Sequence, residues 1–281
     1  MSDSLLARRR AADPGIADLD HVVALAADTI AELSLMPPID LDIVASYFGV
    51  SRVILDDIPW AGCLLVNDGV VEIRLRVGDG RGRRRFSGFH EVTHTFMPGY
   101  RLVPQYRCDP HPLRSSRDEA EVLCDAGASE FLLPKAFFVG DLTVGDFGIA
   151  LLEELADSYD ASLEATAHRI VDFWPEDVAF FSLELRNKPR DLPGAAPALR
   201  VNTMRSRGAF PWVPRHKSVD LGSLTAVLEG EIIDERLANI ELLGQNLGPG
   251  HLVAKPYPFI DQEGNMRQRV LALLRRTQVD Q

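Results

Sequence analysis

His90, Glu91 and His94 form the pattern His-Glu-x-x-His within the run Arg84–Phe96. On an α-helix, an offset of four residues places two side chains on one face, one turn apart. Two imidazoles in that arrangement can each give one nitrogen to the same metal ion. A carboxylate beside them can accept the proton of a water molecule, whose pKa such an ion lowers to about 7. The pattern therefore predicts hydrolytic chemistry at a metal ion, with Glu91 as the general base.

The residues around this pattern also favour a helix. Phe86, Phe89, Val92 and Phe96 recur at helical spacing, so one face can enter a core while both histidines face a cleft. The alternative is a core helix whose two histidines are only hydrogen bonded, because a five-residue pattern can arise by chance. A third metal ligand elsewhere in the chain would favour the metal site.

A catalytic metal site holds three protein ligands and an open position for water. The run Arg117–Ala128 supplies candidates, since it reads as a second helix with small residues at 126–128 that allow close packing. Glu121 and Asp125 lie one turn apart, so Glu121 can bind the metal while Asp125 accepts a hydrogen bond from the far nitrogen of a ligating histidine. Asp118 is the second candidate ligand. Each acid taken singly also fits a solvated helix face.

Two runs, separated by a step of 27 residues from His94 to Glu121, resemble the ImmA/IrrE family of zinc metallopeptidases. The first is Arg84-Arg-Phe-Ser-Gly-Phe-His-Glu-Val-Thr-His94, and the second is Glu121-Val-Leu-Cys-Asp-Ala-Gly-Ala-Ser-Glu-Phe-Leu-Leu-Pro134. The resemblance covers roughly residues 39–170, and the two runs in order are more specific than either alone. It implies that both histidines and Glu121 bind zinc and that Glu91 is the general base. Manganese tolerates the same set of ligands.

The chain departs from the usual text of this family in the second run. Cys124 and Asp125 stand where alanine and asparagine are common, and Gly127, Phe131 and Leu133 replace phenylalanine, leucine and methionine. Aspartate at 125 matches the more distant thermolysin-like pattern Glu-x-x-x-Asp, so its expected role beside a ligating histidine is kept. The substitutions bear on substrate preference rather than on metal binding.

Composition and charge narrow the class of protein. A chain of 281 residues, 46% hydrophobic and 25% charged, is typical of a globular protein with one large domain or two modest ones. Its net charge of -11 argues against a general affinity for nucleic acid or anionic membranes, because phosphate binding needs clustered Lys and Arg.

Three observations favour a cytoplasmic protein. Cys63, Cys108 and Cys124 are an odd number without a Cys-x-x-Cys pair, which suits a reducing compartment. The basic run Arg8–Arg10 is followed by Ala-Ala-Asp-Pro instead of an apolar segment, so we expect no secretion signal. No apolar run approaches the roughly 18 residues that a transmembrane helix needs.

We expect an α+β fold. A zinc-metallopeptidase-like domain of helices and a small sheet should precede a helix-turn-helix-like pair and a small C-terminal α/β domain. The expected divisions are a flexible tail at 1–15, the metallopeptidase domain at 16–145, the helix-turn-helix-like segment with one strand at 146–187, and the last domain at 188–281. By analogy with IrrE-type members the last domain is GAF-like and regulatory, although a structural cap fits its length equally well.

Hydrophobic patterns place the elements before the metal helix. Helices are expected at 16–35 and 40–49, and no basic helix follows the second, which argues against a DNA-reading pair there. Strands are expected at 51–55, 62–66 and 70–77, with a hairpin turn at Asn67-Asp68-Gly69. The hairpin is either an edge that pairs with an extended substrate or a sheet that only packs the helices.

Two segments beside the metal helix carry further candidate side chains. The arginines of the run 79–85 lie among glycines; they could contact an acidic partner, but charge runs in loops are usually solvated, and we expect that here. In the long connection to the second metal helix, Tyr100, Tyr106 or His111 could stabilise an oxyanion, and the sequence does not choose among them. Cys108 with His111 is disfavoured as a separate metal site because no further ligands accompany them.

The remaining elements are expected in the C-terminal half. Helices are expected at 148–158, 163–173, 221–228 and 266–277, and strands at 178–186, 199–203 and 252–260, with a Pro-rich linker at 187–198. The helix at 163–173 offers Glu164, His168 and Arg169, with little positive charge. We therefore expect it to serve packing or protein contact rather than DNA binding.

Together the residues predict a cytosolic zinc-dependent endopeptidase that acts on a protein. The resemblance implies limited cleavage of a helix-turn-helix transcriptional repressor in a stress or mobile-element response. One alternative is a sensor or interaction protein that controls transcription without cleavage; another is a toxin–antitoxin or phage-defence component. Glu91 counts against the first alternative, because a structural metal site needs no general base. Neither membrane association nor direct nucleic-acid binding is expected.

Overall fold

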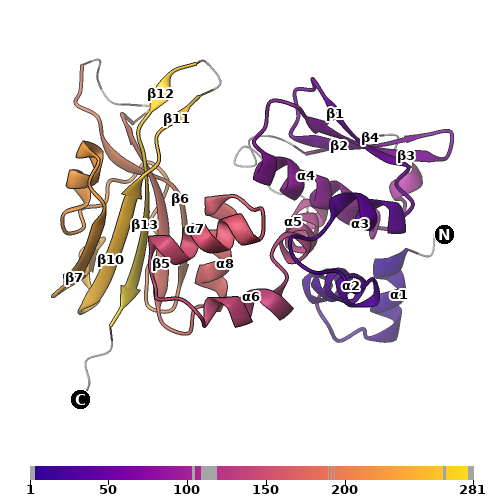
Figure 1. Ribbon diagram of the computed structural model, residues 1–281, viewed down its shortest axis with the longest axis horizontal. Coiled ribbons are helices and arrows are strands. Elements are labelled where there is room, and N and C mark those ends of the chain that lie inside the picture. Colours follow the sequence, from indigo (N-terminus) through magenta and orange to yellow (C-terminus); the bar gives the residue numbers. More distant parts are fainter. Residues whose placement is uncertain are drawn as a thin grey trace. The chain divides into compact units, whose positions relative to one another are not determined.

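The computed structural model describes residues 4–102, 105–108, 119–188, 190, 192, 194–261 and 264–277 (Figure 1). Two compact units make up the chain. The first contains the residues up to Asp141 together with Leu155–Ser162, and the second contains Leu142–Glu154 and the residues from Leu163 onward. Helices and strands occur in both, which confirms the mixed α and β composition. No helix among the described residues is long and apolar enough to cross a membrane.

Six α-helices lie in the first 142 residues among those described: α1 (Leu5–Ala12), α2 (Asp18–Glu32), α3 (Leu41–Tyr47), α4 (Arg81–His94), α5 (Glu119–Leu132) and α6 (Lys135–Leu142). A 3-10 turn, η1 (Tyr100–Leu102), follows α4. Helix α5 packs against both α4 and α2, and α3 packs against α4. The helix of the His-Glu-x-x-His pattern is therefore held on several sides by other helices.

Helix α1 corrects the expectation of a loose tail at 1–15. Ser4 caps the helix by accepting a hydrogen bond from the amide of Ala7 at 3.1 Å. Leu6 is buried, and its amide donates to the carbonyl of Phe96 at 3.1 Å, just beyond the end of α4. A single buried leucine in an otherwise basic segment gives too weak a periodic pattern to be recognised in sequence.

The sheet of the first unit has the strand order β1-β3-β2-β4. Its strands are β1 (Arg52–Asp56), β2 (Gly62–Asn67), β3 (Val70–Arg76) and β4 (Gln105–Cys108), with β1 parallel to β3 and the other pairs antiparallel. The predicted hairpin turn is confirmed, with positive φ at Asp68 and Gly69. Because β2 and β3 each pair on both sides, the hairpin is not an edge, and among the described strands β1 and β4 are.

The second unit is built on an antiparallel sheet of order β6-β5-β13-β10-β7. Its strands are β5 (Val178–Arg186), β6 (Ala198–Arg207), β7 (Ile233–Leu237), β10 (Gly250–Pro256) and β13 (Arg269–Arg276). Two small ribbons accompany it, β8 (Glu241–Leu242) with β9 (Gln245–Asn246) and β11 (Phe259–Ile260) with β12 (Met266–Arg267). Helix α8 (Leu163–Phe173) packs on β5 and β6, and α7 (Ile149–Ser158) contributes residues to both units.

The helix expected at 266–277 is wrong, because this segment forms β12 and β13. Strand β13 lies between β5 and β10, so Val270–Leu274 are all buried. A run buried on both faces is continuously apolar, and sequence periodicity cannot distinguish it from a buried helix. The expected helix at 221–228 is the 3-10 turn η2 (Leu224–Glu229). The described residues beyond 187 therefore contain no α-helix.

The sequence pattern groups strand β5 with the preceding helices, whereas in the structure β5 pairs with β6 and β13 in the larger sheet. Its alternate residues Phe181 and Leu183 belong to the hydrophobic core on one face. Phe180 and Ser182 point to the other face, where they meet α8. This strand therefore joins the helical part of the second unit to the sheet.

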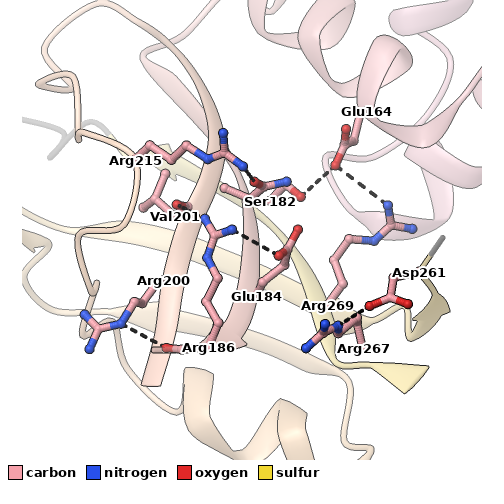
Figure 2. Close-up of polar contacts among 11 residues, drawn as sticks. Glu164, Ser182, Glu184, Arg186, Arg200, Val201, Arg215, Asp261, Arg267 and Arg269 are labelled. Carbon is pink, nitrogen blue, oxygen red and sulfur yellow. Dashed lines mark hydrogen bonds and ion pairs between the residues drawn. The ribbon is translucent and has the colours of Figure 1, made fainter. Parts of the chain in front are cut away.

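Polar side chains of α8 contact the sheet, and Figure 2 shows Glu164 among them. Glu164 accepts a hydrogen bond from the hydroxyl of Ser182 at 2.6 Å and lies 3.8 Å from the guanidinium of Arg269. The ring of His168 packs edge-on against Phe180, with centroids 5.6 Å apart, and burial lowers the pKa of His168. These contacts support the packing role that was expected for this helix.

Gly127 sets how closely α5 approaches its neighbours. A Cβ at this position would lie 2.6 Å from Cγ2 of Thr93 on α4 and 3.1 Å from Cγ1 of Val22 on α2. Both distances are shorter than an ordinary contact between carbon atoms. Gly127 is therefore one of the small residues predicted to allow close packing, and no side chain fits at its position.

We expect Gly127→Ala to destabilise the protein by about 1–3 kcal/mol, because the added methyl overpacks the junction of three helices. Gly140→Ala is the matched control, since a Cβ on Gly140 in α6 meets nothing within 4 Å. The control should stabilise by up to about 1 kcal/mol through the higher helix propensity of alanine. Urea unfolding measures both, and equal effects at the two positions would contradict the packing argument.

Candidate metal centre

Helix α4 carries His90, Glu91 and His94, all of which are buried. The helix is held by its apolar face, on which Phe89 and Val92 are fully buried, and Phe96 just beyond its end is also fully buried. Phe89 stacks on Phe131 of α5 with ring centroids 5.4 Å apart. The two imidazole rings lie 5.0 Å apart at a steep angle, as expected for residues one turn apart on one helix face.

Helix α5 brings three polar side chains to these imidazoles. The carboxylate of Glu121 lies 3.1 Å from Nε2 of His90 and 3.5 Å from Nε2 of His94. Asp125 lies 3.0 Å from Nδ1 of His90, and the Sγ of Cys124 lies 3.4 Å from Nδ1 of His94. Glu121 therefore faces the same nitrogen of both rings, whereas Asp125 and Cys124 each contact the opposite nitrogen of one ring.

The distances from Glu121 to the two histidines are close to those between neighbouring ligand atoms of a zinc ion. In a tetrahedral site with metal–ligand bonds of 2.0–2.1 Å, neighbouring donor atoms are about 3.4 Å apart. The distances from Glu121 to the two Nε2 atoms are 3.1 and 3.5 Å. His90, His94 and Cys124 also form a group whose donor atoms lie within 4.8 Å of one another and could hold a metal. Both sets share the two histidines and differ in the third donor.

Glu91 lies fully buried beside strand β2. A Cβ on Gly62 would come within 3.0 Å of its Oε1, so the absence of a side chain at residue 62 leaves room for the carboxylate. The amide of Leu64 lies close enough to lower the pKa of Glu91 slightly, but neither oxygen has a hydrogen-bond partner of normal geometry among the described residues. Burial dominates and raises the pKa of Glu91 to about 8.

The charges of the site are strongly coupled. Burial lowers the pKa of His90, but contacts with Asp125 and Glu121 outweigh it and raise the pKa to about 10. Burial is the largest single effect on Glu121 and raises its pKa, but the hydrogen bond with His90 and the charges of His90 and His94 together outweigh it and lower the pKa overall. A cation is therefore stabilised between the carboxylates, and a bound metal ion would take the place of the proton on His90.

The arginine run at 81–85 corrects another expectation. It forms the first turns of α4 instead of a solvated loop, and Arg85 is largely buried. Arg81 and Arg85 lie 2.7 and 3.3 Å from the carboxylate of Asp160, and Arg85 donates to the carbonyl of Ile39 at 2.8 Å. These contacts anchor the start of the helix that carries the histidines.

Several other candidates are not brought to the centre by described contacts. Tyr100 lies in η1, where its ring faces the guanidinium of Arg101. Asp118 and His111, and the side chains of Tyr106 and Cys108, lie outside the described residues. Sequence reasoning missed the contact of Cys124 with His94, although its position three residues after Glu121 places it on a neighbouring part of the same helix face.

We expect Asp125→Asn to lower the pKa of His90 by about one unit or more, because the substitution removes a carboxylate that stabilises the imidazolium. Glu119→Gln is the matched control on the same helix, since Glu119 acts on Arg10 instead. Histidine NMR titration in the presence of a chelator measures the pKa. An unchanged His90 pKa in Asp125→Asn would show that this carboxylate does not hold the ring.

The contacts of His90 with Asp125 and Glu121 also make the stability of the fold depend on pH. A folded-state pKa near 10 lies above the unfolded value of about 6.5. Without a bound ion, these contacts of protonated His90 therefore contribute fully to stability below about pH 6.5, and their contribution is lost as the pH rises through about 10. Asp125→Asn should reduce the amount of stability that is lost at alkaline pH.

Comparisons with known proteins agree with the geometry. The family model Peptidase_M78, described as the IrrE N-terminal-like domain, matches residues 70–171. A solved structure described as a Mycobacterium tuberculosis transcriptional regulator shares the fold with a TM-score of 0.54 and 16% identity, over 90% of this chain and 74% of that one. No curated protein sequence matches the chain.

The family match contains α4 and α5 whole, and with them every residue of the candidate metal centre. The likeness to the mycobacterial regulator shows the fold alone, because the identity is low. The resemblance found in the sequence is thereby confirmed. Residues 70–171 form an IrrE N-terminal-like domain of the Peptidase_M78 family.

Proposed function

We propose that this chain is a zinc-dependent endopeptidase in which His90, His94 and Glu121 hold the metal and Glu91 is the general base. The carboxylate of Glu121, which faces Nε2 of both histidines at 3.1 and 3.5 Å, carries this proposal. Two imidazoles and one carboxylate are a donor set that catalytic zinc uses, and manganese tolerates the same set. Asp125 orients His90 from the opposite nitrogen.

Glu91 is suited to move a proton. Zinc, when bound, supplies a Lewis acid that lowers the pKa of water and polarises a peptide carbonyl. Glu91 takes the proton of the attacking water and later delivers it to the departing amine. A carboxyl group whose pKa burial raises to about 8 holds a proton more firmly than an ordinary glutamate near neutral pH. Without a bound ion Glu91 is therefore mostly protonated at neutral pH, and the charge of a bound zinc ion would favour the ionised form that serves as base.

The sheet of the first unit offers a place for an extended substrate. Strand β2 lies beside Glu91 through Gly62, and β4 pairs with β2 as an edge of the described sheet. An edge strand presents unpaired backbone groups, to which an extended peptide can add as another strand. We propose that the substrate backbone binds in this way.

We further propose that the substrate is a helix-turn-helix transcriptional repressor, cut in the cytoplasm during a stress or mobile-element response. The Peptidase_M78 match supports a peptidase of the ImmA/IrrE type, and the similar mycobacterial structure is itself described as a transcriptional regulator. That description favours one alternative, a regulator that binds its partner without cleaving it. A toxin–antitoxin or phage-defence role with another protein target is the remaining alternative.

We expect Glu91→Gln to reduce cleavage of the repressor encoded nearest to this chain by about 100-fold or more, because an amide cannot accept the proton. Zinc affinity should change by less than about tenfold, since Glu91 is not among the proposed ligands. Cleavage is followed by mass spectrometry with added zinc or manganese, and affinity by competition with a chelator. If neither the wild type nor Glu91→Gln cuts a repressor that both bind, the non-proteolytic regulator is the correct function.

We expect Gly62→Ala to lower kcat by about tenfold while zinc affinity stays within about threefold. The added Cβ would lie 3.0 Å from Oε1 of Glu91 and must shift the carboxylate by a few tenths of an ångström. Gly78→Ala is the matched control, because a Cβ there meets nothing within 4 Å. Equal kcat values for the two variants would argue against the placement of Glu91 beside β2.

A further inference from the structure

We infer that Cys124 is a positioning residue that holds the ring of His94 from the side opposite the metal, and that it is not a metal ligand. This inference rests on the proposed function, because it assigns a role within the same centre. Its starting point is the distance of 3.4 Å between Sγ of Cys124 and Nδ1 of His94. Both side chains are buried within the packed helices α4 and α5.

The two histidines are supported in the same manner by consecutive residues of α5. Asp125 contacts Nδ1 of His90 at 3.0 Å, and Cys124 contacts Nδ1 of His94 at 3.4 Å. In both rings Nε2 faces the carboxylate of Glu121. Each ring therefore has one nitrogen toward the shared carboxylate and the other toward its own supporting side chain.

This arrangement argues against sulfur as a ligand of the ion. The two nitrogens of an imidazole lie on different edges of the ring, and their lone pairs point in divergent directions. An ion held by both Nε2 atoms and Glu121 lies on one edge of the His94 ring, whereas the sulfur contacts the other. His90, His94 and Cys124 do form a group that could hold a metal, but the sulfur contacts Nδ1 of His94, the nitrogen opposite the one that faces Glu121.

The contact is compatible with the tautomer that a metal ligand needs. A metal bound at Nε2 requires the hydrogen of the neutral ring on Nδ1, and in that tautomer Nδ1–H donates to the sulfur. A thiol sulfur is a weaker acceptor than a carboxylate. The contact that holds His94 is therefore weaker than the contact that Asp125 makes with His90. Alanine is common at this position in the family that the sequence resembles, so the contact between Cys124 and His94 is a feature of this chain.

Zinc affinity and cobalt spectra of three variants test the inference. Cys124→Ser keeps a small polar acceptor, Cys124→Val fills the space without one, and Cys63→Ser removes a buried thiol from β2 as the matched control. We expect Cys124→Val to bind zinc about tenfold more weakly than the wild type, and Cys124→Ser and Cys63→Ser to stay within about threefold. Affinity is measured by competition with a chromophoric chelator.

The cobalt-substituted protein separates a ligand from a supporting residue. We expect no thiolate-to-cobalt charge-transfer band in the wild type and the same ligand-field spectrum in Cys124→Ser. A charge-transfer band that disappears in Cys124→Ser would make Cys124 a ligand and overturn the inference. Equal zinc affinity in Cys124→Val and the wild type would also overturn it, since the sulfur would then only fill space.

Two further measurements keep the outcomes distinct. Urea unfolding with a chelator present should give the same midpoint for Cys124→Val as for Cys63→Ser, so that the loss of zinc affinity in Cys124→Val is local. Glu121→Gln should weaken zinc binding by more than Cys124→Val does, because it removes a proposed ligand. A wild-type chain that binds no zinc would refute the proposed function itself, whereas the results above refute only the role of Cys124.

Discussion

The close contact between α4 and α5 is the constraint on which the candidate centre depends. Phe89 stacks on Phe131 across this junction, and Gly127 lets the backbone of α5 approach Thr93. The same approach brings Glu121, Cys124 and Asp125 to the two imidazoles. A polar cluster of this kind needs positions accurate to fractions of an ångström, and rigid apolar packing on both sides provides them.

Electrostatics explains why such a cluster is tolerated inside a core. Isolated charges are costly to bury, but pairing and hydrogen bonding offset that cost. Contacts with Asp125 and Glu121 stabilise a proton on His90 strongly enough to raise its pKa to about 10. The same negative field suits a divalent cation. Glu91 differs, because burial outweighs the charge of His90 and raises the pKa of Glu91 to about 8.

Helix α8 of the helix-turn-helix-like segment packs on the sheet of the second unit. Glu164 and His168 of α8 contact Ser182 and Phe180 of the sheet. The family match ends at residue 171, inside α8. The antiparallel sheet that follows lies beyond that match, whereas the fold shared with the mycobacterial regulator covers 90% of the chain.

The amino-acid sequence by itself determined the local features of this protein: the helix around His90 and His94, the helix carrying Glu121, the turn at Asp68, and the resemblance of residues 70–171 to the IrrE N-terminal-like domain. Helical periodicity, turn chemistry and motif spacing are properties of short segments, so they can be read without coordinates. The tertiary structure alone decided which strands form edges, that 269–276 is a central strand, that Leu6 anchors α1, and that Cys124 and Gly62 adjoin His94 and Glu91. Each of these depends on residues distant in sequence meeting in space, and burial on both faces removes the alternation by which a strand is recognised.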